Sequence, residues 1–149
     1  MTTNGNGAAT KGYFFEDLAV GMEASYAKKI TNDDVLAFAD LSGDTNPVHL
    51  DDAYAAQTMF KQRIAHGLLT ASLFSTVLGT RLPGRGCIYL SQSLNFRAPV
   101  HIGDEVVATA KITGLDPEKG CAVLATQAAV NGKSVLDGEA VMMVPRRAA

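Results

Sequence analysis

The sequence has no tryptophan, only two cysteines, and no apolar run of about 20 residues, the length that a transmembrane helix needs. Cys87 and Cys121 belong to no CxxC or Cys/His pattern typical of a zinc site. Both cysteines fall in predicted strands. We therefore expect buried free thiols, with a disulfide as the alternative.

The N-terminal stretch also lacks the features of a targeting signal. Residues 1–12 are rich in Thr, Asn and Gly, and they contain no apolar core of the kind found in signal peptides. We expect a disordered N-terminal tail on a cytoplasmic protein, with no membrane partner.

Neither sign of charge is in large excess. The chain has 13 Lys and Arg against 15 Asp and Glu, a net charge of −2. This balance argues against a nucleic-acid or anionic-membrane partner, because such proteins usually carry a basic excess. The sequence also lacks a Gly-rich phosphate loop. Four cations could make scattered phosphate contacts, although a solvated surface position is the preferred interpretation for each: Arg63, Arg85, Arg97 and Lys111.

The remaining composition is that of one globular domain. The chain has 149 residues, of which 47% are hydrophobic and 19% charged, and a chain of this size buries roughly 68–70% of its unfolded surface. We therefore expect a single domain over residues 13–147.

Helical signals dominate the first half of the chain. After an alternating strand pattern at 23–30, Thr31 and Asp34 form a capping signal for a helix that ends at Gly43. An Ala-rich helix follows Asp51 or Asp52 and runs to about Thr58. The longest helical pattern covers 67–82, and its apolar residues leave little polar surface, so it should be buried on most sides.

The second half of the chain reads as strands. Residues 87–98 alternate in polarity, 105–113 is rich in Val, Thr and Ile, and the Asn131-Gly132 pair predicts a hairpin between two further strands. Helices followed by antiparallel strands predict an α+β domain, with a twisted sheet wrapped around the 67–82 helix. One sheet edge would remain unpaired, which predicts a homodimer.

One short stretch concentrates candidate catalytic groups. Asp44, Asn46 and His49 lie within six residues around Pro47. Proline biases the residue before it away from the helical region, so we expect a rigid loop in which Asp44 and His49 converge. A plain turn is the alternative, because Asp and Asn before Pro are common turn formers.

This stretch, the His66-Gly67-Leu68-Leu69 helix start and the later run from Tyr89 to Phe96 together resemble the MaoC-like hot-dog family, and especially its (R)-specific enoyl-coenzyme A hydratases. The resemblance covers roughly residues 13–145. It implies a hot-dog fold, in which an antiparallel sheet wraps a long central helix. It also implies reversible addition of water to a trans-2-enoyl thioester, giving the (R)-3-hydroxyacyl thioester, with a coenzyme A thioester as substrate and no separate cofactor.

The resemblance assigns roles to individual residues. It makes Asp44 and His49 the catalytic pair that holds one water; we favour Asp44 as the base, although the sequence does not decide between them. Gly67 would bind the substrate carbonyl through its backbone N–H, with easing of a tight helix entry as the alternative. Asn46 and Ser75 would support the site, and for Ser75 a hydroxyl bonded within its own helix is the alternative.

Other interpretations remain open from the sequence. His66 is expected to be a structural imidazole or one that supports the catalytic residues, with a catalytic role as the alternative, and His101 is expected to be exposed and inert. A metal site built from Asp44, His49 and His66 is chemically adequate, but the family offers no metal and none is predicted. The rival functions are a hot-dog acyl-coenzyme A thioesterase, which usually needs an acidic residue on or near the central helix, and a non-catalytic acyl-thioester-binding module.

Overall fold

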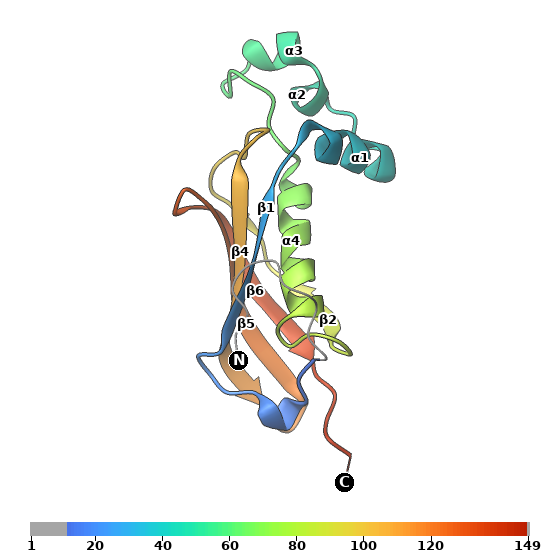
Figure 1. Ribbon diagram of the computed structural model, residues 1–149, viewed down its shortest axis with the longest axis vertical. Coiled ribbons are helices and arrows are strands. Elements are labelled where there is room, and N and C mark those ends of the chain that lie inside the picture. Colours follow the sequence, from blue (N-terminus) through green and yellow to red (C-terminus); the bar gives the residue numbers. More distant parts are fainter. Residues whose placement is uncertain (1–11, 149) are drawn as a thin grey trace.

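The computed structural model describes residues 12–148, and it contains a six-stranded antiparallel sheet curved around one helix (Figure 1). The predicted tail lies almost entirely outside the described residues, so it stays a prediction. The strands run in the order β1 (Glu23–Lys29), β4 (Glu105–Asp116), β5 (Cys121–Val130), β6 (Lys133–Met143) and β2 (Ile88–Gln92), and β3 (Asn95–Phe96) also pairs with β6. The predicted α+β hot-dog architecture is confirmed.

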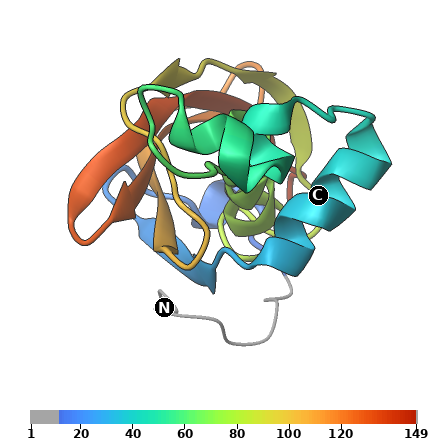
Figure 2. The same ribbon diagram turned by 90° about the horizontal axis from the view of Figure 1, so that it is seen from above.

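The long helix α4 (Gly67–Thr80) lies in the concave side of this sheet (Figure 2). Its buried face carries Leu73, Phe74, Val77 and Leu78, each at most 4% exposed. The expectation of burial on most sides was only partly right, because a second stripe of α4 is open. Leu68 is 59% exposed, and the other members of the stripe are small residues: Ser72, Ser75 and Gly79.

Three helices extend beyond the end of the sheet, next to the N-terminus of α4 (Figures 1 and 2). In α1 (Asn32–Ser42), Thr31 and Asp34 form the predicted capping box, and Gly43 ends the helix with a positive φ of 80°. Two shorter helices follow, α2 (Pro47–Leu50) and α3 (Asp52–Ala56). A 3₁₀ turn, η1 (Phe15–Asp17), lies at the opposite end of the molecule.

The hairpin prediction at Asn131-Gly132 is confirmed. Both residues have positive φ, 51° and 78°, and Val130 pairs with Lys133 directly across the turn. Consecutive positive φ angles are the signature of the type I′ turn, whose twist matches that of the flanking strands. The turn sets the pairing of the residues next to it, and the register of β5 and β6 shifts between Ala128 and Ala129.

The prediction of one continuous strand over 87–98 was wrong. The register shifts between Tyr89 and Ser91, the strand ends at Gln92, and pairing resumes only at Asn95. The carbonyl oxygen of Ser93 approaches β6 so closely that a Cβ on Gly138 would lie 1.8 Å from it. Glycine at 138 therefore permits the chain to cross close to β6 at this break.

The two cysteines are free, as expected. Cys121 is buried at the start of β5, and Cys87 is half-buried just before β2 rather than inside a strand. Burial raises the pKa of the Cys87 thiol, which favours the unreactive protonated form.

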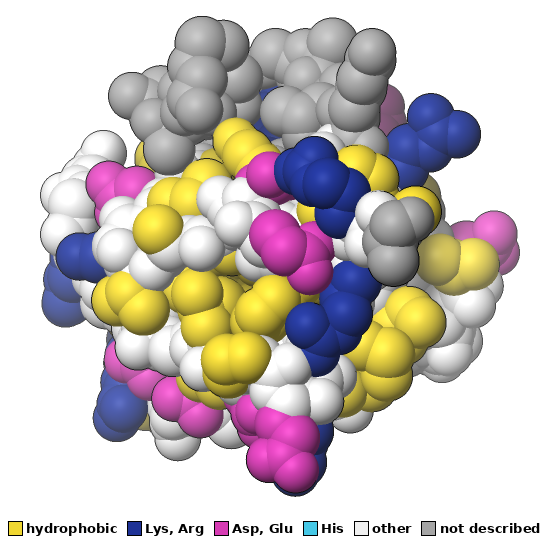
Figure 3. All heavy atoms as spheres, turned by 90° about the horizontal axis from the view of Figure 1, so that it is seen from below, with side chains coloured by type: hydrophobic (Ala, Val, Ile, Leu, Met, Phe, Trp, Pro, Cys, Tyr) yellow, Lys and Arg dark blue, Asp and Glu magenta, His cyan; other side chains and the backbone are white. Residues whose placement is uncertain are grey.

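Charged side chains of both signs are interspersed at the end of the molecule that holds η1 (Figure 3). Ion pairs join this turn to the C-terminal segment, from Arg146 to Glu16 and from Arg147 to Asp17. Among residues 12–148, no helix is long and apolar enough to cross a membrane.

Candidate active site

Asp44 follows the C-terminal glycine of α1 and is held through both its backbone and its side chain. Its carbonyl oxygen accepts a hydrogen bond from Nε2 of His66 at 2.9 Å, and its Oδ1 accepts one from the backbone N–H of Asn46 at 3.2 Å. The residue as a whole is exposed. A fixed backbone and an accessible carboxylate suit a group that meets substrate or water.

The expected rigid loop over 44–49 is a loop only as far as Asn46. Pro47 begins the short helix α2, and the Oδ1 of Asn46 caps it by accepting the backbone N–H of Val48 at 3.2 Å. Proline suits this first helical position because its φ is already helical and no N–H is needed there. The sequence prediction missed this turn of helix, which carries His49 and leaves Asn46 in a capping role.

His49 lies on the buried side of α2, at 8% exposure. Its Nδ1 lies 2.7 Å from the carbonyl oxygen of Ile64. A carbonyl only accepts hydrogen bonds, so Nδ1 carries the proton, and the neutral ring keeps a lone pair on Nε2. The ring is therefore arranged to accept a proton at Nε2.

The pKa of His49 lies below its ordinary range. Burial is the largest cause, since it disfavours the charged ring, and the neighbouring His66 lowers the pKa further. The hydrogen bond to Ile64 and the charge of Asp44 act in the opposite direction. The net effect keeps His49 neutral at neutral pH.

The structure brings Asp44, His49 and His66 together, with one polar side-chain atom from each within 4.8 Å of the others. The His49 and His66 rings are stacked, with centroids 3.9 Å apart and planes inclined by 28°. Ring nitrogens bind metals along lone pairs that lie in the ring plane, at about 2.0–2.1 Å. Two rings stacked this way direct their lone pairs along nearly parallel planes, which does not suit coordination of one ion.

Gly67 is the first residue of α4, directly after His66. The first N–H groups of a helix lack intrahelical acceptors, and they lie at the positive end of its dipole. A Cβ at Gly67 would lie 2.6 Å from Cε1 of Phe96, so the glycine also lets this ring pack against the helix start. The position therefore combines an available donor with close approach of a neighbouring group.

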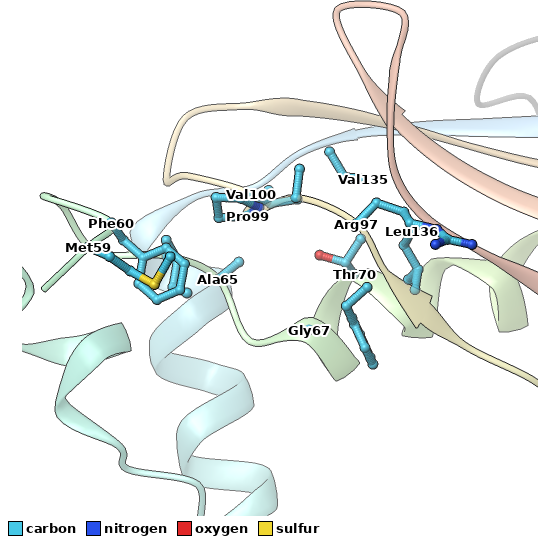
Figure 4. A pocket seen from close by; sticks show the side chains of 13 residues that line it. Met59, Phe60, Ala65, Gly67, Thr70, Arg97, Pro99, Val100, Val135 and Leu136 are labelled. Atoms are coloured by element: carbon cyan, nitrogen blue, oxygen red, sulfur yellow. The ribbon is translucent and has the colours of Figure 1, made fainter.

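An apolar hollow of about 430 Å³ opens beside Gly67 (Figure 4). Met59 and Phe60 lie on one side of it, and Leu136 and Thr70 lie on the other. Its inner wall is buried and hydrophobic, formed by Ala65, Val100, Val135 and Leu136. Such a lining suits a hydrocarbon or thioester portion of a ligand better than its charged groups.

Ser75 does not join the Asp44 and His49 cluster within this chain. It is exposed on the open stripe of α4, eight positions after Gly67 and so roughly 12 Å further along the helix. There it lines a shallow hollow with Tyr89, Leu90 and Gln92 of β2. Its supporting role stays a prediction.

Arg63 has a structural role that its sequence position did not indicate. Its Nε donates to the carbonyl oxygen of His49 at 2.7 Å, and a terminal nitrogen donates to Oδ1 of Asn32 at 2.7 Å. These bonds attach the active-site helix α2 to the start of α1. No periodicity or motif predicts such a contact between residues that lie 14 and 31 positions apart.

The other cations and the histidine that were predicted to lie at the surface make fewer contacts than Arg63. Arg97 pairs with Asp137 at 3.0 Å, and Arg85 and Lys111 are exposed. His101 is half-buried rather than exposed as expected, because residue 101 forms an isolated bridge with Ile64, and its Nδ1 lies 3.7 Å from Asp104.

Comparisons with known proteins show what the chain is similar to. A family model described as "MaoC like domain" matches residues 17–134. An (R)-specific enoyl-CoA hydratase from Rhodospirillum rubrum is 55% identical over 135 residues, covering 91% of this chain and 94% of the relative.

Two solved structures are also close in fold. The unliganded R-hydratase of Pseudomonas aeruginosa superposes with a TM-score of 0.87 at 44% identity, covering 91% of this chain and 88% of that one. The (R)-hydratase of Aeromonas caviae, involved in PHA biosynthesis, superposes with a TM-score of 0.85 at 48% identity. The match covers 87% of this chain and 99% of that one.

Proposed function

This chain belongs to the MaoC-like family, and from that premise we propose that it is an (R)-specific enoyl-CoA hydratase, a hydro-lyase. It adds water reversibly to a trans-2-enoyl-CoA and forms the (R)-3-hydroxyacyl-CoA. The hydroxyl group goes to C3 and a proton to C2 of the acyl chain, so no redox partner is needed. The coenzyme A thioester is the substrate, and the reaction as written uses no separate cofactor.

Asp44 and His49 are proposed to hold the attacking water as two acceptors. The resting carboxylate carries no proton, and the bond to Ile64 leaves Nε2 of His49 unprotonated. A water that donates one hydrogen to each group keeps its oxygen lone pairs free for attack on C3. The single observation that carries this proposal is the buried His49, with its tautomer fixed, beside the Asp44 carboxylate.

The proton that leaves the water is then the one that C2 receives, because neither resting group has another to give. Imidazole, with an ordinary pKa near ~6.5, is a stronger base than a carboxylate near ~3.9. We therefore assign the proton transfer to Nε2 of His49, with the Asp44 charge stabilising the imidazolium. Asp44 as the base, which was favoured from the sequence, is the alternative to this assignment.

Attack at C3 places negative charge on the thioester oxygen. The backbone N–H of Gly67 is proposed to stabilise that charge, and the positive end of the α4 dipole supports it. The adjacent hollow has an apolar lining, and a substrate bound in it would separate the carbonyl from water. Asn46 supports the site by capping α2, the helix that presents His49.

A direct assay tests the proposal and separates it from thioester hydrolysis. Purified protein is mixed with crotonyl-coenzyme A, and the loss of enoyl-thioester absorbance is followed together with the release of free thiol. Hydration removes the absorbance without thiol release, whereas thiol release would identify a thioesterase. The absence of any Asp or Glu on α4 favours the first result.

We further propose that the enzyme is a homodimer joined at β2. This edge strand reads Ile-Tyr-Leu-Ser-Gln and has no charged residue, whereas the other edge, β1, carries Lys28 and Lys29. Charged residues protect a sheet edge from pairing, and their absence on β2 leaves it open to a second copy. Leu90, 48% exposed, and the open stripe of α4 would be covered together.

In such a dimer Ser75 would lie at the joint between protomers, which is where its proposed support of the site would act. A cytoplasmic location is part of the same proposal. Coenzyme A is proposed as the carrier, as in the printed name of the Rhodospirillum rubrum relative.

A further inference from the structure

His66 occupies a position that the proposed reaction does not itself require. It is 2% exposed and precedes α4, yet its side chain makes no capping bond to that helix. Instead the ring lies against His49 at a centroid distance of 3.9 Å and against Phe38 at 4.8 Å. A buried polar ring placed between two aromatic rings needs an explanation.

The hydrogen bonding of His66 shows which of its ring nitrogens is a donor. Nε2 lies 2.9 Å from the carbonyl oxygen of Asp44, and because a carbonyl only accepts, Nε2 carries the proton. Nδ1 is buried and has no hydrogen-bond partner among the described residues. Nε2 is therefore the nitrogen through which His66 donates its hydrogen bond.

These two contacts reach both members of the proposed catalytic pair. The donor of His66 holds the backbone of Asp44, and the side chain of Asp44 accepts a hydrogen bond from the N–H of Asn46. The ring of His66 covers one face of the His49 imidazole. The side chain of His66 therefore influences both the position of the Asp44 carboxylate and the exposure of the His49 ring to water.

We propose that His66 is a positioning residue for hydration, which fixes Asp44 through its N–H and keeps His49 dry through its ring. This inference rests on the proposed function, because it takes Asp44 and His49 as the groups that hold the attacking water. His66 itself does not touch the reacting atoms in this scheme.

The surroundings of His49 support the second half of the proposal. Within residues 12–148, the charged or titratable groups near it are the Asp44 carboxylate, the His66 ring, and the Arg63 guanidinium at its carbonyl oxygen. Burial is the largest cause of its lowered pKa. Part of that burial is the stacked ring of His66, so a variant without this ring should let the pKa rise.

Two substitutions separate the two functions of His66. His66→Phe keeps a ring against His49 but removes the donor to Asp44, whereas His66→Gln keeps an N–H donor but removes the ring. The matched control is His101→Gln, which changes a half-buried histidine outside the site. Each variant is measured as full-length protein for kcat and KM on crotonyl-coenzyme A across pH, and for the His49 titration by NMR.

We expect the two variants to have different effects, one on kcat and the other on the pH profile. In His66→Phe, kcat falls roughly ten- to a hundredfold, since small misplacements of catalytic groups cost about this much, while KM and the acid limb of the pH profile stay in place. In His66→Gln, kcat is better retained, but the acid limb and the His49 titration move upward toward about 6.5. His101→Gln behaves as the wild type.

The proposal is overturned if His66→Phe keeps the wild-type kcat and His66→Gln leaves the acid limb unmoved. It is also overturned if both variants lose kcat equally, with unchanged pH profiles and lowered unfolding midpoints, which would mark a structural role alone. The NMR titration of unliganded protein needs no turnover. The titration therefore tests whether the His66 ring shields His49 even if the wild type hydrates no enoyl thioester. Such a lack of hydration would contradict the proposed function, not the shielding of His49.

Discussion

Nδ1 of His49 lies 2.7 Å from the carbonyl oxygen of Ile64, and this one contact determines which imidazole nitrogen can accept a proton. Ile64 belongs to the irregular segment that leads into α4, while His49 sits on the short helix α2. The bond therefore joins the two chain segments that supply the proposed base and the proposed oxyanion donor. It explains how a neutral buried histidine keeps its lone pair on Nε2.

Removing either acceptor of the attacking water should nearly abolish hydration. Asp44→Asn and His49→Gln are each expected to lower kcat by about 10²–10⁴, the usual range for loss of a general acid or base. The measurement is the rate of crotonyl-coenzyme A hydration, with the folded state checked by circular dichroism. Asp40→Asn, at an exposed site on α1, is the matched control and should keep full activity. Wild-type rates in both site variants would contradict the assignment.

The pH dependence should show an acid limb below about 6.5, the ordinary pKa of histidine. Because burial lowers the pKa of His49, the ring stays neutral and able to accept a proton to a lower pH than a solvent-exposed histidine. Activity is therefore expected to hold as pH falls through 6.5 and to decline only below it. The profile of kcat/KM, which reports on the free enzyme, checks this. A limb above 6.5 would mean that another group controls the rate.

Substitution at Gly67 should separate its two possible requirements. Gly67→Ala places a Cβ against the Phe96 ring, and it also obstructs a ligand at the helix N-terminus. We expect kcat/KM to fall by about 10²–10³, as for loss of an oxyanion donor. Adding Phe96→Ala relieves the steric contact and should not restore activity. Full rescue in the double variant would instead show that only the packing of Phe96 requires glycine. Gly114→Ala, which meets only ordinary contacts, is the control.

Much of the fold could be predicted because its signals are local. The capping box at Thr31 and Asp34, the glycine that ends α1 and the Asn131-Gly132 turn each act over a few residues, and each is present in the structure. The break after Gln92 could not be predicted, since it depends on how closely Ser93 approaches Gly138 of another strand. Alternating polarity does not encode that approach.

The candidate site, like the fold, combines features that the sequence predicts with contacts that depend on residues distant in the chain. Pro47 indicated a rigid stretch and the resemblance indicated Asp44 and His49, so their proximity could be expected. The bonds that hold them come from Ile64 and His66, which lie 15 and 22 residues further along the chain. Every residue type carries a backbone carbonyl, so the sequence does not show which one accepts from His49. The tautomer of His49 therefore follows only from the folded structure.

The dimer proposal predicts that a charge on β2 separates the protomers. Leu90→Asp places a carboxylate on the exposed edge strand, and in a two-fold pairing it would have to be buried at the interface. Light scattering should then give the mass of a single chain, 15.7 kDa, in place of twice that mass. Leu41→Asp, on α1 at 85% exposure, should leave the mass unchanged. A Leu90→Asp protein that keeps the wild-type mass would rule out β2 as the joint.

Arg63 should prove important for both stability and activity. Its side chain is mostly covered and donates to the carbonyl oxygen of His49 and to Asn32, while Asp52 lies 3.9 Å away. Arg63→Met keeps much of the apolar stem but leaves the His49 carbonyl without this donor, which should cost about 1.5–3 kcal/mol, as for hydrogen bonds to charged groups.

Because α2 carries the proposed base, kcat should fall together with the free energy of unfolding. Urea denaturation and hydration kinetics measure the two effects on the same sample. Lys61→Met, which removes an exposed cation two residues earlier, should change neither quantity. If Arg63→Met lowered stability and left kcat untouched, Arg63 would anchor the helices without positioning His49, and the rigidity of the site would have to come from Ile64 and His66 alone.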